Sequence, residues 1–210
     1  MMKGLNSNIG IIWDHLFNIK SRFWTSRLDP FKALNAIVIA CNPVEASTVT
    51  SEESLPKCAV PSDLVITRSV IEKAIDNQVI GGRSQVLAGL DALAIMTGPN
   101  ENGPWKMYKS WNMAPYFTPE AAAFLSRDLR LSHWLVDLPS VDRMMDGGEL
   151  LCHRAFFGSS KERFITELCY FDPKSSIVMG QQYRLFFHYL PWWILGDVIP
   201  TRPILMECDK

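Results

Sequence analysis

Apolar residues gather in short runs along the chain, separated by polar, turn-forming segments. Three runs are rich in aliphatic residues, and we expect them to be strands of one sheet: Ala36–Cys41, Leu90–Thr97 and His133–Leu138. Two later strands are expected within YRLFFHYLPWWIL (183–195), where Pro191 limits the strand, and within RPILME (202–207). Between the first two runs, residues 42–63 are rich in Ser, Thr, Pro and Glu, which predicts a surface loop.

Segments with helical spacing of apolar residues separate these strands. In the segment 67–77, Thr67 is a suitable N-cap, and four apolar residues share one helix face: Val70, Ile71, Ala74 and Ile75. A second helix is expected over Thr118–Arg130, because Thr118 is a good N-cap, Pro119 fits the first helical position and Glu120 suits the helix dipole. Alternating strands and helices predict an α/β fold, and the strand-rich ends predict a mixed sheet.

The composition is typical of a globular protein. The length of 210 residues predicts one domain, with 48% hydrophobic and 20% charged residues. A formal net charge of −1 without blocks of like charge gives no electrostatic basis for binding nucleic acid. The sequence contains no uncharged apolar run of about 18 residues that would predict a membrane span, and its start lacks the pattern of a signal peptide.

The cysteine pattern predicts reduced thiols. The chain has five cysteines, an odd number, and none forms a C-x-x-C pair. We therefore expect core thiols of a cytoplasmic protein rather than disulfides or a structural zinc site. A Cys152–His153 catalytic pair is disfavoured, because neighbouring side chains point to opposite faces of a strand and diverge by about 100° on a helix.

Several common enzyme motifs are absent from the sequence. The chain has no Walker phosphate loop, dinucleotide fingerprint, nucleophile elbow or H-E-x-x-H zinc helix. His133, at the start of a strand, is expected to have a packing or surface role. His188, inside an aromatic strand, is expected to be buried with a satisfied hydrogen bond.

A polar segment between a predicted strand and His153 is the candidate site. The stretch LVDLPSVDRMMDGGELLCHRAFF (135–157) is either a simple loop or a site at the carboxyl end of a strand, where ligands bind in open α/β folds. On the second interpretation, His153 and Glu167 are suitable ligands for a divalent metal ion. Asp142 is expected to pair with the adjacent Arg143, and Asp146 begins a predicted Asp-Gly-Gly turn.

The order of motifs in this region resembles the kynurenine formamidase-like family of metal-dependent cyclases. That family has a strand ending in D-x-P-S-x-D, then H-R-x-x-x-G, then a glutamate before an apolar residue. Here these positions are Asp137, Pro139, Ser140 and Asp142, then His153, Arg154 and Gly158, then Glu167 and Leu168. The strand LDALAIMTG, the helix-then-strand segment before Asp137 and the closing strand TRPILME are also similar, so the resemblance covers the chain from about Ala36 to its end.

The resemblance implies a fold, an activity and a set of roles. The fold would be a swivelling β/β/α domain with a mixed sheet, assembled as a homodimer or homotetramer. The activity would be hydrolysis of a cyclic or N-formyl amide with zinc or manganese. His153 and Glu167 would be metal ligands, Asp137, Ser140 and Arg154 would support the loop, and His15 would match the proton-shuttle histidine.

The N-terminal part of the chain departs from the family. Members carry H-x-G-T-H-x-D-x-P-x-H, which supplies most of the metal ligands, whereas residues 1–30 lack this motif and Ile11 occupies the position of its aspartate. Two ligands rarely hold a catalytic zinc ion. Three explanations remain open: a truncated version of an active enzyme, a non-catalytic relative that acts as a structural or interaction subunit, or a site completed by a partner subunit.

Aromatic residues near the C-terminus lead to an expectation about assembly. The segment YRLFFHYLPWWIL carries more large aromatics, including Trp192 and Trp193, than one small domain easily buries. We expect part of this surface to pack in a homo-oligomer, since exposed apolar patches usually mark interfaces.

Overall fold

The computed structural model describes residues 10–11, 17–20, 32–98, 113–158, 162–172, 174–189 and 198–208. The first two of these segments are described only as strands, without their side chains. His15, Pro191, Trp192 and Trp193 lie outside the described residues.

Four parallel strands form the centre of the main sheet. Their order is β3 (Leu34–Ala40), β6 (Ala92–Met96), β8 (His133–Val136) and β9 (Phe164–Glu167). The three strands predicted from apolar runs are confirmed, each with ends shifted by up to two residues. Because all four run in the same direction, their carboxyl ends, and the loops that follow, lie at one edge of the sheet.

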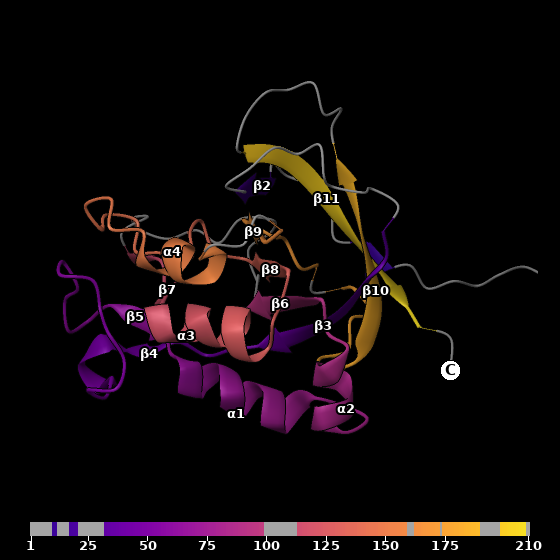
Figure 1. The fold of residues 1–210 in the computed structure, drawn as a ribbon, viewed down its shortest axis with the longest axis horizontal. Coiled ribbons are helices and arrows are strands. Elements are labelled where there is room, and N and C mark those ends of the chain that lie inside the picture. The colour runs from indigo at the N-terminus through magenta and orange to yellow at the C-terminus, as the bar shows by residue number, and fades with distance from the viewer. Residues whose placement is uncertain are drawn as a thin grey trace, which may run out of the picture.

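Antiparallel strands curl this sheet into a closed ring. β10 (Gln182–Tyr189) pairs with β3, and β11 (Val198–Glu207) pairs with β10. β2 (Phe17–Lys20) pairs with both β11 and β9, so that it joins the two ends of the sheet, as Figure 1 shows. β1 (Gly10–Ile11) also pairs with β11, at Ile204 and Leu205. The sheet is mixed, as predicted.

Helices cover the outer face of the sheet. α1 (Arg68–Gln78) is followed by α2 (Arg83–Ala88), and α3 (Pro119–Ala123) lies between α1 and α4 (Leu151–Phe157) (Figure 1). The second predicted helix is present, but after Ala123 it continues as a π-helical segment, η4 (Phe124–Asp128). The wider turn is a tertiary feature, since the sequence pattern there fits an α-helix equally well.

A small second sheet was not predicted. It consists of β4 (Val44–Glu45), β5 (Leu64–Ile66) and β7 (Tyr116–Phe117), and a 3-10 turn, η2 (Ala46–Thr48), follows β4. The prediction that residues 42–63 form only a surface loop is therefore wrong at β4 and η2. The strands are very short and pair with partners about 20 and 50 residues away, so local patterning does not reveal them.

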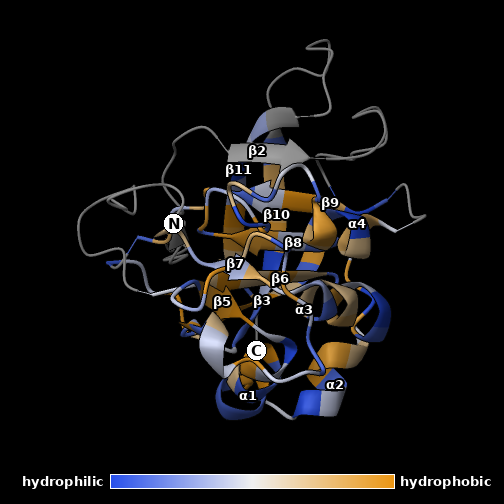
Figure 2. Cartoon of the chain, turned by 90° about the vertical axis from the view of Figure 1, so that its left-hand side faces the viewer, coloured by the Kyte–Doolittle hydropathy of each residue, from blue (hydrophilic) through white to orange (hydrophobic). Residues whose placement is uncertain are grey.

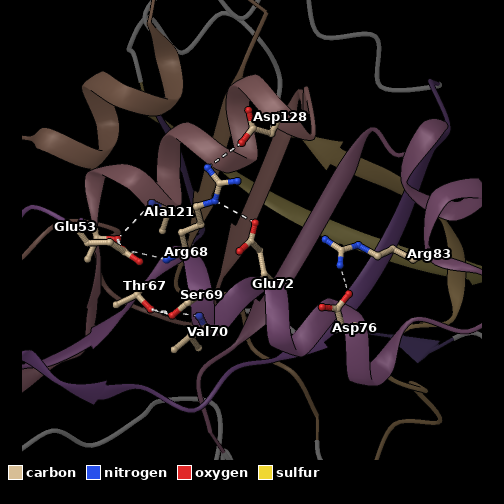
Figure 3. Close-up of polar contacts among 11 residues, drawn as sticks. Glu53, Thr67, Arg68, Ser69, Val70, Glu72, Asp76, Arg83, Ala121 and Asp128 are labelled. Carbon is tan, nitrogen blue, oxygen red and sulfur yellow. Dashed lines mark hydrogen bonds and ion pairs between the residues drawn. The ribbon is translucent and has the colours of Figure 1, made fainter. Parts of the chain in front are cut away.

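The glutamate side chain of Glu53 joins the N-termini of α1 and α3. Thr67 caps α1 as predicted, because its Oγ1 accepts a hydrogen bond from the backbone N–H three residues later at 3.2 Å, and Thr118 caps α3 in the same way at 3.3 Å. The carboxylate of Glu53 accepts from the backbone N–H of Arg68 at 3.1 Å (Figure 3). It also accepts from the Thr118 hydroxyl. The surface segment that carries Glu53 is thus fastened across both helix starts.

Alternating residues of the parallel strands divide the core into two clusters. Ile37, Ile39 and Trp134 face the helices, whereas Ala36 and Val38 face the inside of the ring. Hydrophobic residues are concentrated on these central strands (Figure 2). The apolar surface buried on the two faces of the sheet is the main source of stability.

The aromatic strand β10 contributes to the inner cluster. Tyr183, Leu185 and Phe187 are buried there, and His133 is stacked between Phe164 and Phe187. The packing role expected for His133 is therefore confirmed. The burial expected for His188 is wrong, because its side chain is exposed on the face of β10 that points away from this cluster. Among the described residues, no helix is long and apolar enough to cross a membrane.

Candidate functional site

The site lies where the parallel strands β8 and β9 end. The loop from Pro139 to Leu150 connects β8 to α4 and contains neither helix nor strand. Asp137 precedes this loop, and its carboxylate accepts hydrogen bonds from the backbone N–H of Thr97, at 3.0 and 2.9 Å, and from the Thr97 hydroxyl at 2.7 Å. Asp137 therefore joins the ends of β8 and β6.

Asp142 holds His153 at the start of α4. Its carboxylate accepts from the backbone N–H of Cys152 at 2.7 Å and of His153 at 3.3 Å, and it contacts the His153 ring at Nδ1 at 2.5 Å. The carboxylate thus satisfies free N–H groups of the first helical turn and fixes the imidazole in place. The predicted pairing of Asp142 with Arg143 is wrong, because Arg143 turns the other way and binds Asp63.

His153 and Glu167 converge, as the sequence predicted. Nε2 of His153 lies 3.4 Å from Oε1 of Glu167, and their side chains are only 7% and 2% exposed. Glu167 is the last residue of β9 and points to the helix-covered face, while its Oε1 also accepts from the backbone N–H of Val141 at 3.1 Å. Helix α4 and strand β9 therefore bring together two residues that are fourteen positions apart in the sequence.

The electrostatics of the site favour a positive charge between His153 and Glu167. Burial by itself raises the pKa of Asp142. Hydrogen bonds from the His153 ring and from the backbone N–H of Cys152 have the opposite effect and together outweigh burial, so the pKa lies below its ordinary value and Asp142 is a carboxylate. A carboxylate at Nδ1 keeps the proton of a neutral imidazole on that nitrogen, so that Nε2 presents its lone pair. Nε2 is buried without a hydrogen-bond partner and faces a carboxylate oxygen. A metal ion bound at Nε2 would satisfy this lone pair.

The donor set fits part of a metal site. An imidazole whose other nitrogen binds a carboxylate, next to a second carboxylate, is a common arrangement around zinc and manganese. A catalytic zinc ion normally takes three protein ligands. Within the described ranges, however, no group of three His, Cys, Asp or Glu residues is placed to hold a metal ion. The pair therefore supplies two positions of a site that the described part of the chain does not complete.

The other predicted site residues are placed around this pair or lie elsewhere. Ser140 is half-buried, and its Oγ accepts from the backbone N–H of Asp142 at 3.2 Å, which supports the loop. Arg154 is exposed on α4, next to His153 in the chain. His15 lies outside the described residues. The strand that begins two residues after it, β2, places Asn18 opposite Glu167 in the register with β9.

The structure also shows the thiol of Cys152 and the turn at Asp146. Cys152 is buried, its Sγ donates to the carbonyl of Phe117 at 2.9 Å, and burial raises the pKa of its thiol well above the ordinary value. Such a thiol is a poor nucleophile, as expected. Asp146 forms the predicted turn by accepting from the backbone of Gly148 and Leu150. All five cysteines are among the described residues, and all are free thiols.

Sequence reasoning missed the part that Asp142 and Val141 play. The sequence predicts an ion pair between Asp142 and Arg143, because the two are adjacent in the chain. The carboxylate belongs instead to a helix that begins nine residues later. The backbone N–H of Val141 carries no sequence signal, since every residue except proline has that group.

Comparison with solved structures finds a similar fold. A potential metal-dependent hydrolase with cyclase activity superposes with a TM-score of 0.53 at 17% identity, covering 92% of this chain and 79% of that one. Isatin hydrolase A from Labrenzia aggregata gives a TM-score of 0.49 at 12% identity, covering 92% and 73%. An isatin hydrolase bound to thioisatinate gives 0.49 at 14% identity, covering 90% and 70%. The first likeness confirms the predicted cyclase-type α/β fold.

Comparisons of the sequence itself add no relative. No family profile matches the chain, and no curated protein does. The assignment of function therefore depends on the fold and on the geometry of the site.

Proposed function

We propose that this chain is a metal-dependent hydrolase that acts on a cyclic or N-formyl amide. The single observation that carries the proposal is the buried convergence of His153 Nε2 and Glu167 Oε1 at the carboxyl ends of the parallel strands. The fold supports it, because the structure with the best TM-score cited above is a potential metal-dependent hydrolase with cyclase activity. The two other structures are isatin hydrolases, and isatin contains a cyclic amide.

The roles of the residues follow from their contacts. His153 and Glu167 would be two ligands of a zinc or manganese ion, and Asp142 would orient the imidazole through Nδ1. When bound, such an ion lowers the pKa of a water molecule and polarises a carbonyl group. Asp137 and Ser140 keep the loop in place. We assign proton transfer to His15, which matches the family's proton-shuttle histidine in the sequence.

A non-catalytic relative is the second candidate. One observation favours it: the described residues offer two ligands rather than three. In such a protein, a shared proton would satisfy Asp142, His153 and Glu167, and the network would have a purely structural role. The chain would then act as a structural or interaction subunit.

Metal binding separates the two candidates. We expect the full chain to bind Zn²⁺ or Mn²⁺ weakly in calorimetric titration, and we expect His153→Ala and Glu167→Gln each to weaken binding by about tenfold or more. Hydrolysis of N-formylkynurenine and of isatin, followed by absorbance, should be slow and sensitive to chelators. His188→Ala is the matched control, because it removes an exposed histidine on β10. Binding that persists unchanged in both site variants would refute the assignment, and a wild-type chain that binds neither ion would favour the second candidate.

We also propose that the protein assembles as a homodimer or homotetramer. Core burial accounts for Tyr183, Leu185 and Phe187, but large apolar side chains remain exposed on the loop beside the site: Met144, Met145 and Leu150. Light scattering at tens of micromolar protein should give the mass of two or four chains. A monomer under these conditions would contradict the proposal.

A further inference from the structure

Two consecutive residues of the loop after β8 contact the candidate metal ligands. The backbone N–H of Val141 donates to Oε1 of Glu167 at 3.1 Å, and the carboxylate of Asp142 contacts Nδ1 of His153 at 2.5 Å. The carbonyl of Val141 accepts from the backbone N–H of Phe117 at 2.9 Å. The position of this short stretch therefore sets where both side chains lie.

The next residue, Arg143, is bound to the small sheet. Its Nε donates to Oδ2 of Asp63 at 2.8 Å and its Nη2 to Oδ1 at 3.5 Å, while Nη1 donates to the carbonyl of Met145 at 3.1 Å. Asp63, which directly precedes β5, also accepts from the hydroxyl of Tyr116 on β7 at 3.1 Å. The side chains of Arg143 and Asp63 are only 12% and 8% exposed, so water screens the ion pair far less than it screens a surface pair.

The pKa values of this cluster agree with a tight pair. The pKa of Asp63 lies below its ordinary value. Burial by itself raises this pKa, but several hydrogen bonds lower it by more, and the largest of these effects is the hydrogen bond from Arg143. Burial and the charge of Asp63 raise the pKa of the Tyr116 hydroxyl, which keeps it a donor. The cluster therefore holds a fixed set of charges that keeps Arg143 in one orientation.

The ion pair is close enough to the site along the chain to fix its geometry. Consecutive Cα atoms are about 3.8 Å apart, so a fixed Arg143 leaves Asp142 little room to move. The loop has no helix or strand of its own, and it depends on side-chain contacts for its shape. The small sheet supplies none of the contacts described above to the His153 or Glu167 side chains, yet it holds the segment that positions them.

We propose that Asp63 and Arg143 are positioning residues that set the arrangement of His153 and Glu167 for metal binding. The part that concerns metal affinity rests on the proposed function, whereas the part that concerns the orientation of the His153 ring does not. Loss of the ion pair would let Val141 and Asp142 shift, which would weaken the contact at Nδ1 and move Nε2 relative to Glu167.

Asp63→Asn is the test, because it keeps the shape and the acceptor for Tyr116 but removes the charge. The first readout is the pair of ring ¹⁵N shifts of His153 in protein with labelled histidine, assigned with His153→Gln. The second is Zn²⁺ affinity by calorimetry. We expect the Nδ1 shift to change and the affinity to fall by about tenfold, a typical effect of losing a group that orients a ligand. Unchanged ring shifts in folded Asp63→Asn would overturn the proposal.

Two further variants keep the result interpretable. Asp76→Asn is the matched control, since it removes the charge from an ion pair with Arg83 that is exposed on α1 and α2 (Figure 3). It should leave the ring shifts and the Zn²⁺ affinity unchanged. If Asp63→Asn does not fold, Arg143→Lys tests the proposal instead. Lysine keeps the positive charge but cannot bind both carboxylate oxygens of Asp63 as Nε and Nη2 do. We expect smaller changes in the ring shifts and in Zn²⁺ affinity, in the same direction. If the wild-type chain binds neither Zn²⁺ nor Mn²⁺, the proposed function fails, and the ring shifts alone decide on positioning.

Discussion

Gly180→Ala is expected to destabilise the protein by roughly 3–5 kcal/mol. A Cβ atom at this position would lie 1.7 Å from the carbonyl oxygen of Gln78 and 2.8 Å from Cα of Val79. Both neighbours are backbone atoms, so no side chain can rotate to make room. Gly180 also has a φ of 74°, a conformation that alanine adopts only with strain.

The site of this clash holds several elements together. The backbone N–H of Gly180 donates to the carbonyl of Val38 on β3 at 2.7 Å, and its carbonyl accepts from the N–H of Ile80, just after α1, at 3.1 Å. The side chain of Gln78 both accepts from and donates to the backbone of Ala40 at 2.8 Å. Displacing Gly180 therefore separates the end of α1 from the central strand β3.

Urea denaturation followed by circular dichroism measures the effect. Gly147→Ala is the matched control, because Gly147 has a similar φ of 71° but a Cβ there would meet nothing within 4 Å. The control should lose about 1 kcal/mol from backbone strain alone. Equal losses in the two variants would show that the contact with Gln78 is unimportant.

The protein is also expected to lose stability as the pH falls below about 6.5, because of His133. Burial, aided by the nearby positive charge of Lys32, lowers the pKa of this side chain from 6.5 to about 3. The ring is stacked against Phe164 at 4.9 Å and Phe187 at 5.1 Å between centroids, and the residue is only 7% exposed, so a charge there would be poorly solvated. His133 is therefore neutral in the folded protein throughout this range.

The sign of the effect follows from where the proton binds. Below the unfolded pKa of 6.5, the unfolded chain takes up a proton that the folded chain does not, so acid favours unfolding until the pH reaches the folded pKa of about 3. The loss from this residue is about 1.4 kcal/mol per pH unit, or about 2–3 kcal/mol between about pH 6.5 and about pH 4.5.

His133→Phe isolates this contribution. Phenylalanine keeps a ring between the two aromatic neighbours and does not titrate. Ser132 loses its contact with Nδ1 at 3.0 Å but retains the carbonyl of Asp91 as an acceptor at 3.1 Å. Urea denaturation at several pH values should show a shallower decline in the variant over this range. Parallel curves for the two proteins would contradict the assignment to His133.

Local pattern alone was sufficient for three of the four parallel strands, β3, β6 and β8, and for the starts of α1 and α3. A strand buried on both faces needs a continuous apolar run, and Thr67 and Thr118 cap helices because a hydroxyl before a helical segment satisfies free N–H groups wherever it occurs. The strands and the caps depend on residues that lie close together in the sequence. The meeting of His153 and Glu167 was implied instead by the resemblance of the ordered motifs to the cyclase family, since their spacing alone is weak evidence.

Tertiary structure decided the features that join distant segments. The small sheet, the closure of the ring through β2 and β11, and the ion pair between Asp63 and Arg143 link residues about 20 to 180 positions apart. Asp142 shows the reason most directly. The sequence places a charged partner, Arg143, next to it. In the folded protein Asp142 is buried against the start of α4 and the His153 ring and bonds to these, while Arg143 reaches Asp63 beside the small sheet. A polar side chain is matched by whatever the fold brings within hydrogen-bond distance, and only the packing of strands and helices determines which group that is.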